Sequence, residues 1–143
     1  MRTQNAKLIE GGIFSDERGT LSFVNAFNLL LVKRFYFISN VNIDVIRAWQ
    51  GHKIESRWFY CTEGSFDVRL IKIDNWDCPS KIQRVEKYIL NANEPSVLYI
   101  PKGYLNGFKA FEDNSKLMIL SDYRLNEISG DDYRYDKELW TNW

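Results

Sequence analysis

Hydrophobic and polar residues alternate along several short stretches of the chain. Near the middle, Phe66, Val68 and Leu70 alternate with Asp67 and Arg69. This two-residue period is the pattern of a β-strand with one buried face. Other strand-like stretches, bounded by turn-forming residues, are 20–25, 29–39, 56–62, 81–91, 96–101 and 116–123. We therefore predict a fold built almost wholly from short strands.

Turn signals separate these stretches. Glu63-Gly64-Ser65 lies between two strand patterns and predicts a hairpin. Residues 102–108 carry two glycines and predict a turn after the strand that Pro101 ends. The tail, residues 130–140, begins with acidic residues and predicts a short C-terminal helix. Together the pattern indicates an all-β sandwich or barrel, formed by one domain over residues 1–143.

Composition excludes several classes of function. The 143 residues contain 19 basic and 19 acidic side chains, so the chain lacks the excess positive charge typical of a nucleic-acid-binding or membrane-surface protein. A local basic pocket for a phosphate stays possible. No segment is apolar for long enough to span a bilayer, and the first residues lack the apolar core of a signal peptide. We expect a cytoplasmic protein.

Cysteine and histidine offer little for a metal centre. Cys61 and Cys78 are far apart in sequence, and we interpret them as two buried, reduced thiols. His52 is the one histidine of the chain. Carboxylates could bind a hard cation, but no cluster in the sequence has metal-ligand spacing, so we expect no metal.

His52 lies in the segment RAWQGHK, residues 47–53, and its role decides whether the protein is an enzyme. It could be a catalytic base, a metal ligand or an ordinary buried imidazole. Gln50 and His52 are two residues apart, so on a strand both face the same side. Arg47 is an odd number of residues from His52, so both can face one cavity only if a bulge or bend interrupts the strand.

Several stretches resemble cupins that act on nucleotide sugars. SDERGTL resembles their Asp-x-Arg-Gly opening, and RAWQGHK resembles the Arg-Gly-x-His-x-His-Lys segment of the dTDP-4-keto-6-deoxyglucose 3,4-ketoisomerases. EGSFDVRLIKID, LYIPKGYLNGF and SDY are similar to the body of the dTDP-4-dehydrorhamnose 3,5-epimerases. The tail DDYRYDKEL resembles the end of the ketoisomerases. The resemblance implies a cupin, a double-stranded β-helix or jelly roll, that is usually dimeric.

The resemblance also implies site residues. His52 matches the second histidine of the ketoisomerase segment and would be the catalytic base, with Tyr36 as a second proton-transfer candidate. Arg18 and Arg47 match arginines that contact the nucleotide diphosphate, a role that suits the guanidinium fork. Gln50 would line the pocket beside His52.

The chain departs from the family pattern at three positions. Gln50 stands where the epimerase base histidine falls, Asn106 replaces the histidine of the Pro-x-Gly turn, and Met118 falls near the epimerase tyrosine. None of these side chains transfers protons near neutral pH. We therefore predict against 3,5-epimerase activity, and we assign Gln50 and Asn106 to substrate binding.

The leading hypothesis is a ketoisomerase-type proton transfer on a dTDP-linked 4-keto-6-deoxyhexose, in sugar synthesis for surface polysaccharides. It needs no cofactor, and the protein would be a homodimer. A second hypothesis is a catalytically inactive cupin that binds a sugar nucleotide or another small molecule. A third is an isomerase of a different sugar. The sequence leaves all three open.

Overall fold

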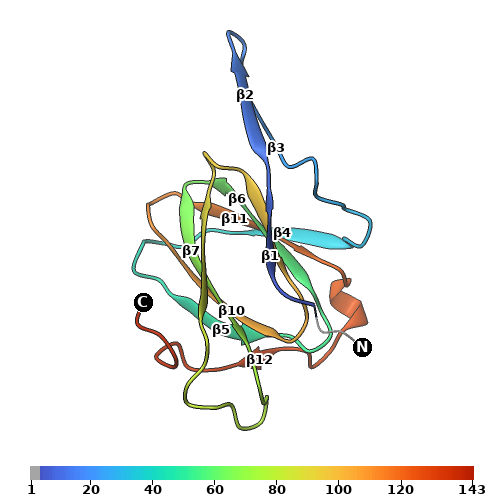
Figure 1. The fold of residues 1–143 in the computed structure, drawn as a ribbon, viewed down its shortest axis with the longest axis vertical. Helices are drawn as coiled ribbons and strands as arrows, with labels where there is room; N and C mark the ends of the chain where they lie inside the picture. The colour runs from blue at the N-terminus through green and yellow to red at the C-terminus, as the bar shows by residue number, and fades with distance from the viewer. Residues whose placement is uncertain (1–3) are drawn as a thin grey trace.

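The computed structural model describes residues 4–143, which form two facing antiparallel sheets of five strands (Figure 1). The strand order is β1-β9-β6-β11-β4 in the first sheet and β12-β5-β10-β7-β8 in the second. The first sheet comprises β1 (Lys7–Glu10), β4 (Arg34–Ile38), β6 (Arg57–Glu63), β9 (Ser96–Ile100) and β11 (Lys116–Ser121). The second comprises β5 (Arg47–Gly51), β7 (Ser65–Lys72), β8 (Glu86–Asn91), β10 (Tyr104–Ala110) and β12 (Tyr133–Arg134). The expected all-β jelly roll is confirmed.

The main hydrophobic core lies between the two sheets. Its largest fully buried members come from both of them and include Phe59, Phe66, Leu98 and Leu117. The aromatic rings of Phe59 and Phe66 both pack edge-on against Phe108. Near β4 and β5 the residues between the sheets become polar, and this end of the sandwich holds the cleft described below.

The predicted hairpin at Gly64 is wrong, although the two strands are confirmed. β6 pairs with β9 and β11, whereas β7 pairs with β8 and β10, so Gly64 joins one sheet to the other. Gly64 has φ of +69°, and a Cβ there would lie 2.1 Å from the Ser115 Oγ. Glycine therefore permits a corner between the sheets that sequence pattern alone does not distinguish from a hairpin.

Residues 102–108 are mostly strand rather than turn. Gly103 takes the turn, with φ of +95°, but Gly107 lies within β10. A Cβ at Gly107 would lie 2.7 Å from the Ala48 Cβ and 2.8 Å from the Trp143 ring. Here glycine marks close packing over a central strand.

The predicted C-terminal helix is also wrong. Tyr133 and Arg134 form β12, which pairs with β5, and Tyr135 exchanges two backbone hydrogen bonds with Trp49. The tail then runs over the outer face of the second sheet, where Trp140 and Trp143 pack against Trp49 (Figure 1). Open backbone groups of β5 and this aromatic packing favour an extended tail over an isolated short helix.

The tail explains why Asp67 and Arg69 are buried although they alternate with core residues. The Arg69 guanidinium forms an ion pair with Asp67 at 2.9 Å and donates to the backbone oxygen of Asn142 at 2.6 Å. It also lies 4.4 Å from the centre of the Trp143 ring. The tail therefore covers a face that the alternation predicted to be exposed.

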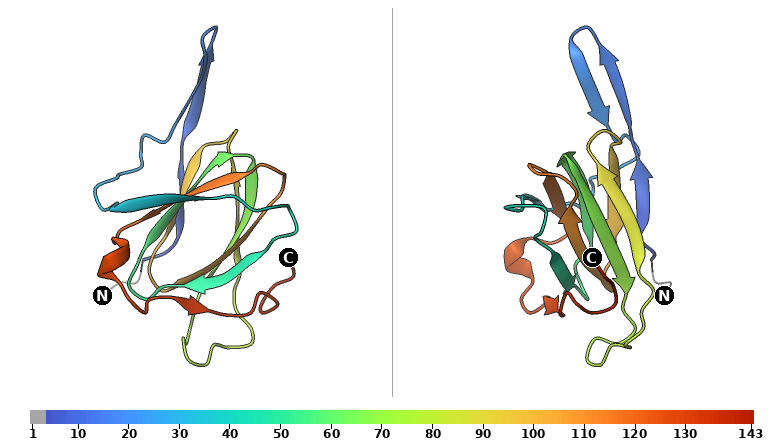
Figure 2. Two further views of the ribbon diagram at one scale, coloured as in Figure 1. Left: turned by 180° about the vertical axis from the view of Figure 1, so that it is seen from behind. Right: turned by 90° about the vertical axis from the view of Figure 1, so that its left-hand side faces the viewer.

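A separate hairpin projects beyond the sandwich. It consists of β2 (Gly12–Asp16) and β3 (Gly19–Phe23), and in Figure 2 it extends well past the ends of the other strands. Phe14 and Leu21 on this hairpin are exposed. Among residues 4–143, no helix has the length and apolar character needed to cross a membrane.

The cysteines are only partly as expected. Cys61 and Cys78 form no disulfide, as predicted. Cys61 is buried, but Cys78 is exposed in the loop that follows β7.

Candidate active site

A polar cleft opens between the sheets where β4, β5 and the segment before β12 meet. It has two adjoining parts that share Tyr36, Gln50 and Arg57. The outer part, the His52 pocket, has a volume of about 380 Å³ and also includes Glu55 and Asp131. The inner part has a volume of about 410 Å³ and is lined further by Arg47, Ala48, Asn106, Phe108 and Arg134, among others.

A bulge brings Arg47 and Gln50 to the same cleft. In the pairing of β10 with β5, Asn106 lies opposite Gln50 and Phe108 lies opposite Arg47. An advance of two residues along β10 therefore corresponds to three residues along β5. The expected break in the alternation is thereby confirmed. His52 follows directly after β5, at the mouth of the cleft.

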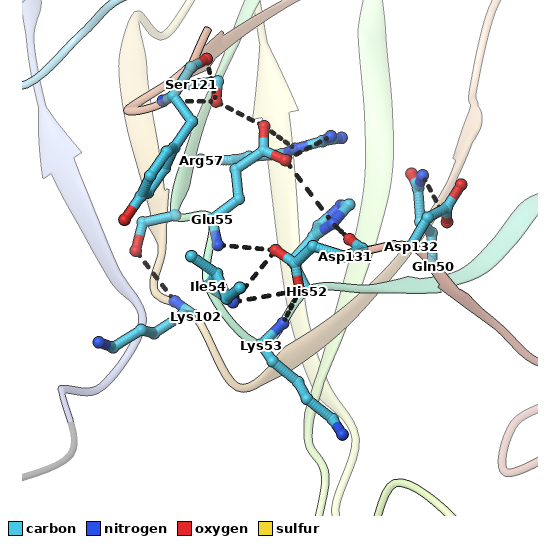
Figure 3. Close-up of polar contacts among 12 residues, drawn as sticks. Gln50, His52, Lys53, Ile54, Glu55, Arg57, Lys102, Ser121, Asp131 and Asp132 are labelled. Carbon is cyan, nitrogen blue, oxygen red and sulfur yellow. Dashed lines mark hydrogen bonds and ion pairs between the residues drawn. The ribbon is translucent and has the colours of Figure 1, made fainter. Parts of the chain in front are cut away.

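His52 is buried and held by its Nδ1 atom (Figure 3). Nδ1 lies 2.5 Å from the backbone oxygen of Asp131. Because a carbonyl oxygen can only accept, Nδ1 carries a hydrogen, so in the neutral ring Nε2 is the unprotonated nitrogen. Nε2 is buried without a hydrogen-bond partner among the described residues. The structure therefore presents the sole imidazole in the form of a free base.

The surroundings of His52 keep it neutral. Burial lowers the pKa of His52 below its ordinary value of 6.5, and the positive charge of Arg57 lowers it further. The Asp131 carbonyl and the Glu55 carboxylate act in the opposite direction but do not outweigh these effects. At neutral pH the imidazole can accept a proton.

Tyr36 belongs to a second, connected network. Arg57 Nη1 donates to the Tyr36 hydroxyl oxygen at 2.8 Å, and Arg57 Nε and Nη2 donate to the two carboxylate oxygens of Glu55 at 3.1 and 3.2 Å. Arg34 and Ser121 also donate to Glu55. Since Arg57 donates to the Tyr36 oxygen, the phenolic hydrogen is free to point elsewhere, and Tyr36 lines both parts of the cleft.

Opposite effects set the protonation states of this network. Burial raises the pKa of the Tyr36 phenol above 10, although the charges of Arg57 and Arg34 partly offset it. Burial also opposes ionisation of Glu55, but the hydrogen bonds from Arg57 and Ser121 outweigh it and lower the pKa of the carboxyl. Glu55 is thus ionised and Tyr36 protonated at neutral pH, so Tyr36 can donate a proton.

Glu55, Arg57 and Asp131 are the site residues that sequence reasoning missed. A buried charged residue next to a strand carries no distinctive local pattern, and Asp131 belongs to a tail expected to be helical. One signal was present: Glu55 and Arg57 follow His52 closely, with the two-residue spacing that puts them on one side of an extended chain.

The predicted binding residues separate into two groups. Gln50 and Asn106 line the cleft; Gln50 Nε2 donates to Asp132, and Asn106 Nδ2 donates to the Gln50 backbone oxygen. Arg47 lines the inner part. Arg18 does not: it lies at the tip of the projecting hairpin, paired with Asp16 at 2.7 Å, with a side chain that is 81% exposed.

Met118 does not bear on the cleft. It packs on the outer face of the first sheet with Trp58 and Leu120, while its neighbours Leu117 and Ile119 face the core. Met118 therefore does not occupy a position from which it could take part in proton transfer within the cleft.

Three side chains of the site have metal-like spacing. Ligand atoms of His52, Glu55 and Asp131 lie within 4.8 Å of one another. However, the Asp131 carboxylate already accepts from the backbone N–H groups of Lys53, Ile54 and Glu55. Glu55 is occupied by arginines, whose charge would repel a metal cation. This donor set fits a hydrogen-bonded support better than a metal site.

The lowered pKa of His52 predicts a specific pH dependence of stability. An unfolded imidazole titrates near 6.5, so below that pH the unfolded chain binds a proton more readily than the native protein. Relative to His52→Asn, the wild-type protein should therefore lose free energy of unfolding as pH falls from about 8 to about 5. Urea denaturation of both proteins at several pH values measures this. A difference that stays constant, or that favours the wild type in acid, would contradict a neutral buried imidazole.

Comparisons with known proteins agree with the fold. Solved structures of similar fold include a double mutant of the QdtA 3,4-ketoisomerase from Thermoanaerobacterium thermosaccharolyticum in complex with TDP. It has 25% sequence identity and a TM-score of 0.70, and the match covers 94% of this chain and 90% of that chain. The TDP-quinovose 3,4-ketoisomerase WlaRB from Campylobacter jejuni has 24% sequence identity and a TM-score of 0.68, and the match covers 93% of this chain and 95% of that chain.

A dTDP-4-dehydrorhamnose 3,5-epimerase from Bacillus anthracis str. Ames, with TDP and PPi bound, has the same fold. It is 20% identical with a TM-score of 0.75, and the match covers 97% of this chain and 85% of that chain. No curated protein sequence matches. The family model described as "FdtA: WxcM-like, C-terminal" matches residues 4–142, nearly the whole length, and the chain therefore belongs to this family of cupins related to dTDP-sugar isomerases.

Proposed function

We propose that this protein is a sugar 3,4-ketoisomerase that acts on a dTDP-linked 4-keto-6-deoxyhexose. The observation that carries the proposal is the neutral His52, whose unpartnered Nε2 lies at the same cleft as the protonated Tyr36. A base for the carbon-bound proton and an acid for the ketone oxygen are what such a reaction needs. The relatives of similar fold include two 3,4-ketoisomerases, one of them in complex with TDP.

The proposed mechanism moves two protons and regenerates both side chains. Nε2 of His52 takes the proton from the carbon next to the ketone, and the ketone oxygen takes the phenolic proton of Tyr36, which gives an enediol. The hydroxyl proton on the first carbon then passes to the Tyr36 oxygen. His52 returns its proton to the former ketone carbon, so ketone and hydroxyl have exchanged places.

Arg57 and Glu55 support the acid half of this mechanism. When Tyr36 has given up its proton, the hydrogen bond from Arg57 stabilises the phenolate, and the bidentate contact with Glu55 fixes the guanidinium. The pre-oriented charge lies in a buried site, where it stabilises a developing anion more strongly than in water.

The diphosphate is assigned to the inner part of the cleft. Arg47 there donates to the neutral side-chain oxygen of Asn40, so no carboxylate neutralises it at this contact. Gln50 and Asn106 would donate or accept hydrogen bonds from the sugar. Arg18 is too far along the projecting hairpin to serve the cleft of its own chain, and it could reach only a site formed with a second copy.

We also propose that the protein forms a homodimer in the cytoplasm and serves surface-polysaccharide synthesis. The exposed Phe14 and Leu21 of the hairpin favour burial against a second chain. Sedimentation at micromolar concentration measures this, and a monomer mass would count against it.

The alternative is a cupin that binds a sugar nucleotide without converting it. Gln50 favours this alternative, because an amide replaces the first histidine of the ketoisomerase segment and is hydrogen-bonded to Asp132. The 3,5-epimerase reaction stays disfavoured for the same reason.

Solvent exchange separates the two functions. In deuterated water, the wild-type protein and dTDP-4-keto-6-deoxyglucose should give a 3-keto product with deuterium at a carbon next to the ketone. His52→Asn should slow incorporation roughly a hundred- to ten-thousand-fold because an amide cannot cycle a proton. Tyr36→Phe should slow it as well. Tyr99→Phe is the matched control, since Tyr99 stacks on Trp58 on the outer face. Proton NMR measures product and label.

Two results would redirect the proposal. Binding of the sugar nucleotide without exchange by the wild-type protein would favour the inactive binder. Full exchange by His52→Asn would show that another group is the base.

Ligand stabilisation tests the nucleotide site. Binding to the native state alone should raise the free energy of unfolding by roughly 2.7 kcal/mol when dTDP is at a hundredfold excess over its dissociation constant. Arg47→Ala should diminish the increase in melting temperature, whereas Arg84→Ala should not, because Arg84 lines neither part of the cleft. No increase with any nucleoside diphosphate would argue against a nucleotide-sugar site.

A further inference from the structure

Asp131 lines the outer part of the cleft, binds both His52 and the backbone that follows it, and is not a residue that the proposed chemistry uses directly. Its backbone oxygen accepts from His52 Nδ1 at 2.5 Å. Its carboxylate accepts from three successive backbone N–H groups, those of Lys53 at 2.7 Å, Ile54 at 3.1 Å and Glu55 at 2.9 Å (Figure 3). Asp131 is itself only 6% exposed.

The register of β12 explains how a residue of the tail reaches this place. Tyr133 pairs with Gly51 and Arg134 with Gln50. Continued by two residues, the same antiparallel register places Asp131 opposite Lys53, the residue after the imidazole. The pairing of β12 with β5 thus places the Asp131 carboxylate at the start of the loop 53–55.

The loop 53–55 connects Asp131 to the acid half of the site. Glu55, whose backbone N–H is bound by Asp131, holds Arg57 through two hydrogen bonds, and Arg57 donates to the Tyr36 oxygen. A displaced loop would move the Glu55 carboxylate, and with it the guanidinium that orients the Tyr36 hydroxyl. The same displacement would pull His52 from its carbonyl partner.

We propose that Asp131 is a positioning residue that aligns both proton-transfer groups, His52 through its carbonyl and Tyr36 through the loop 53–55, Glu55 and Arg57. The inference rests on the proposed function for its kinetic consequence but not for its structural one. A carboxylate suits the task because it only accepts, with enough lone pairs for three N–H donors. An asparagine of the same shape would turn its own N–H groups toward some of them.

Asp131→Asn therefore tests the inference, with Asp122→Asn as the matched control. Asp122 accepts one backbone N–H from the same stretch, that of Ser56 at 2.9 Å, but bonds to neither His52 nor Glu55. For Asp131→Asn, kcat should fall by about tenfold or more while KM changes little, since misplacement of reacting groups acts on the transition state. Asp122→Asn should retain wild-type kcat and KM.

The single histidine supplies a readout that is independent of activity. Because His52 is the one histidine, a sample labelled with ¹⁵N in the histidine ring alone gives signals only from Nδ1 and Nε2 of His52. The wild-type protein and Asp122→Asn should show the form with hydrogen on Nδ1, and Asp131→Asn a mixture of both neutral forms. A merely structural loss of stability would not change which nitrogen carries the hydrogen in the folded protein.

The outcomes separate this inference from the proposed function. Wild-type kcat and an unchanged imidazole spectrum in Asp131→Asn would overturn the positioning role and leave the isomerase proposal intact. A wild-type protein without isomerase activity, together with the mixed spectrum in Asp131→Asn, would overturn the isomerase proposal and support the positioning role. If Asp131→Asn does not fold, Asp131→Glu, which displaces the carboxylate by one methylene group, is measured in the same way. Unchanged kcat and spectrum in that variant would equally overturn the role.

Discussion

The antiparallel pairing of the tail with β5 is the interaction on which the cleft depends. Two residues of β12 and the flanking Tyr135 bind the backbone of β5, and this short ladder brings residues 130–132 to the mouth of the cleft. Without it, His52 would have no acceptor for Nδ1–H and the loop 53–55 no carboxylate. The aromatic side chains that follow β12 stabilise this pairing because they pack against Trp49 on the outer face of the second sheet. Hydrophobic burial on that face therefore holds the polar residues of the cleft in place.

Charge is arranged in the cleft so that each group keeps one protonation state. Two arginines form ion pairs with Glu55 and offset the unfavourable burial of its charge. Removing one partner of a buried ion pair typically destabilises a protein by about 3–5 kcal/mol. Burial and, after it, the positive charge of Arg57 lower the pKa of the nearby imidazole and keep it neutral. The Arg57 guanidinium thus helps to keep the base His52 unprotonated and holds the acid Tyr36 in place by a hydrogen bond.

Much of the fold follows from the sequence, because period-two alternation survives wherever one face of a strand is buried. Alternation does not assign strands to sheets, so it does not distinguish the corner at Gly64 from a hairpin. It also could not show that the tail covers Arg69. In the site, His52, Tyr36, Gln50, Arg47 and Asn106 do line one cleft, whereas Arg18 lies outside it. The role of Asp131 is not predictable from local sequence, because it depends on the long-range register between β12 and β5.

The proposed chemistry requires that His52 is a neutral base with a free Nε2. A pH titration of the ¹⁵N spectrum of the wild-type protein, labelled in the histidine ring, measures this state. We expect one neutral form with hydrogen on Nδ1 at neutral pH, and a protonation midpoint below the ordinary pKa of 6.5. A midpoint above 6.5, or hydrogen on Nε2 in the neutral form, would contradict it.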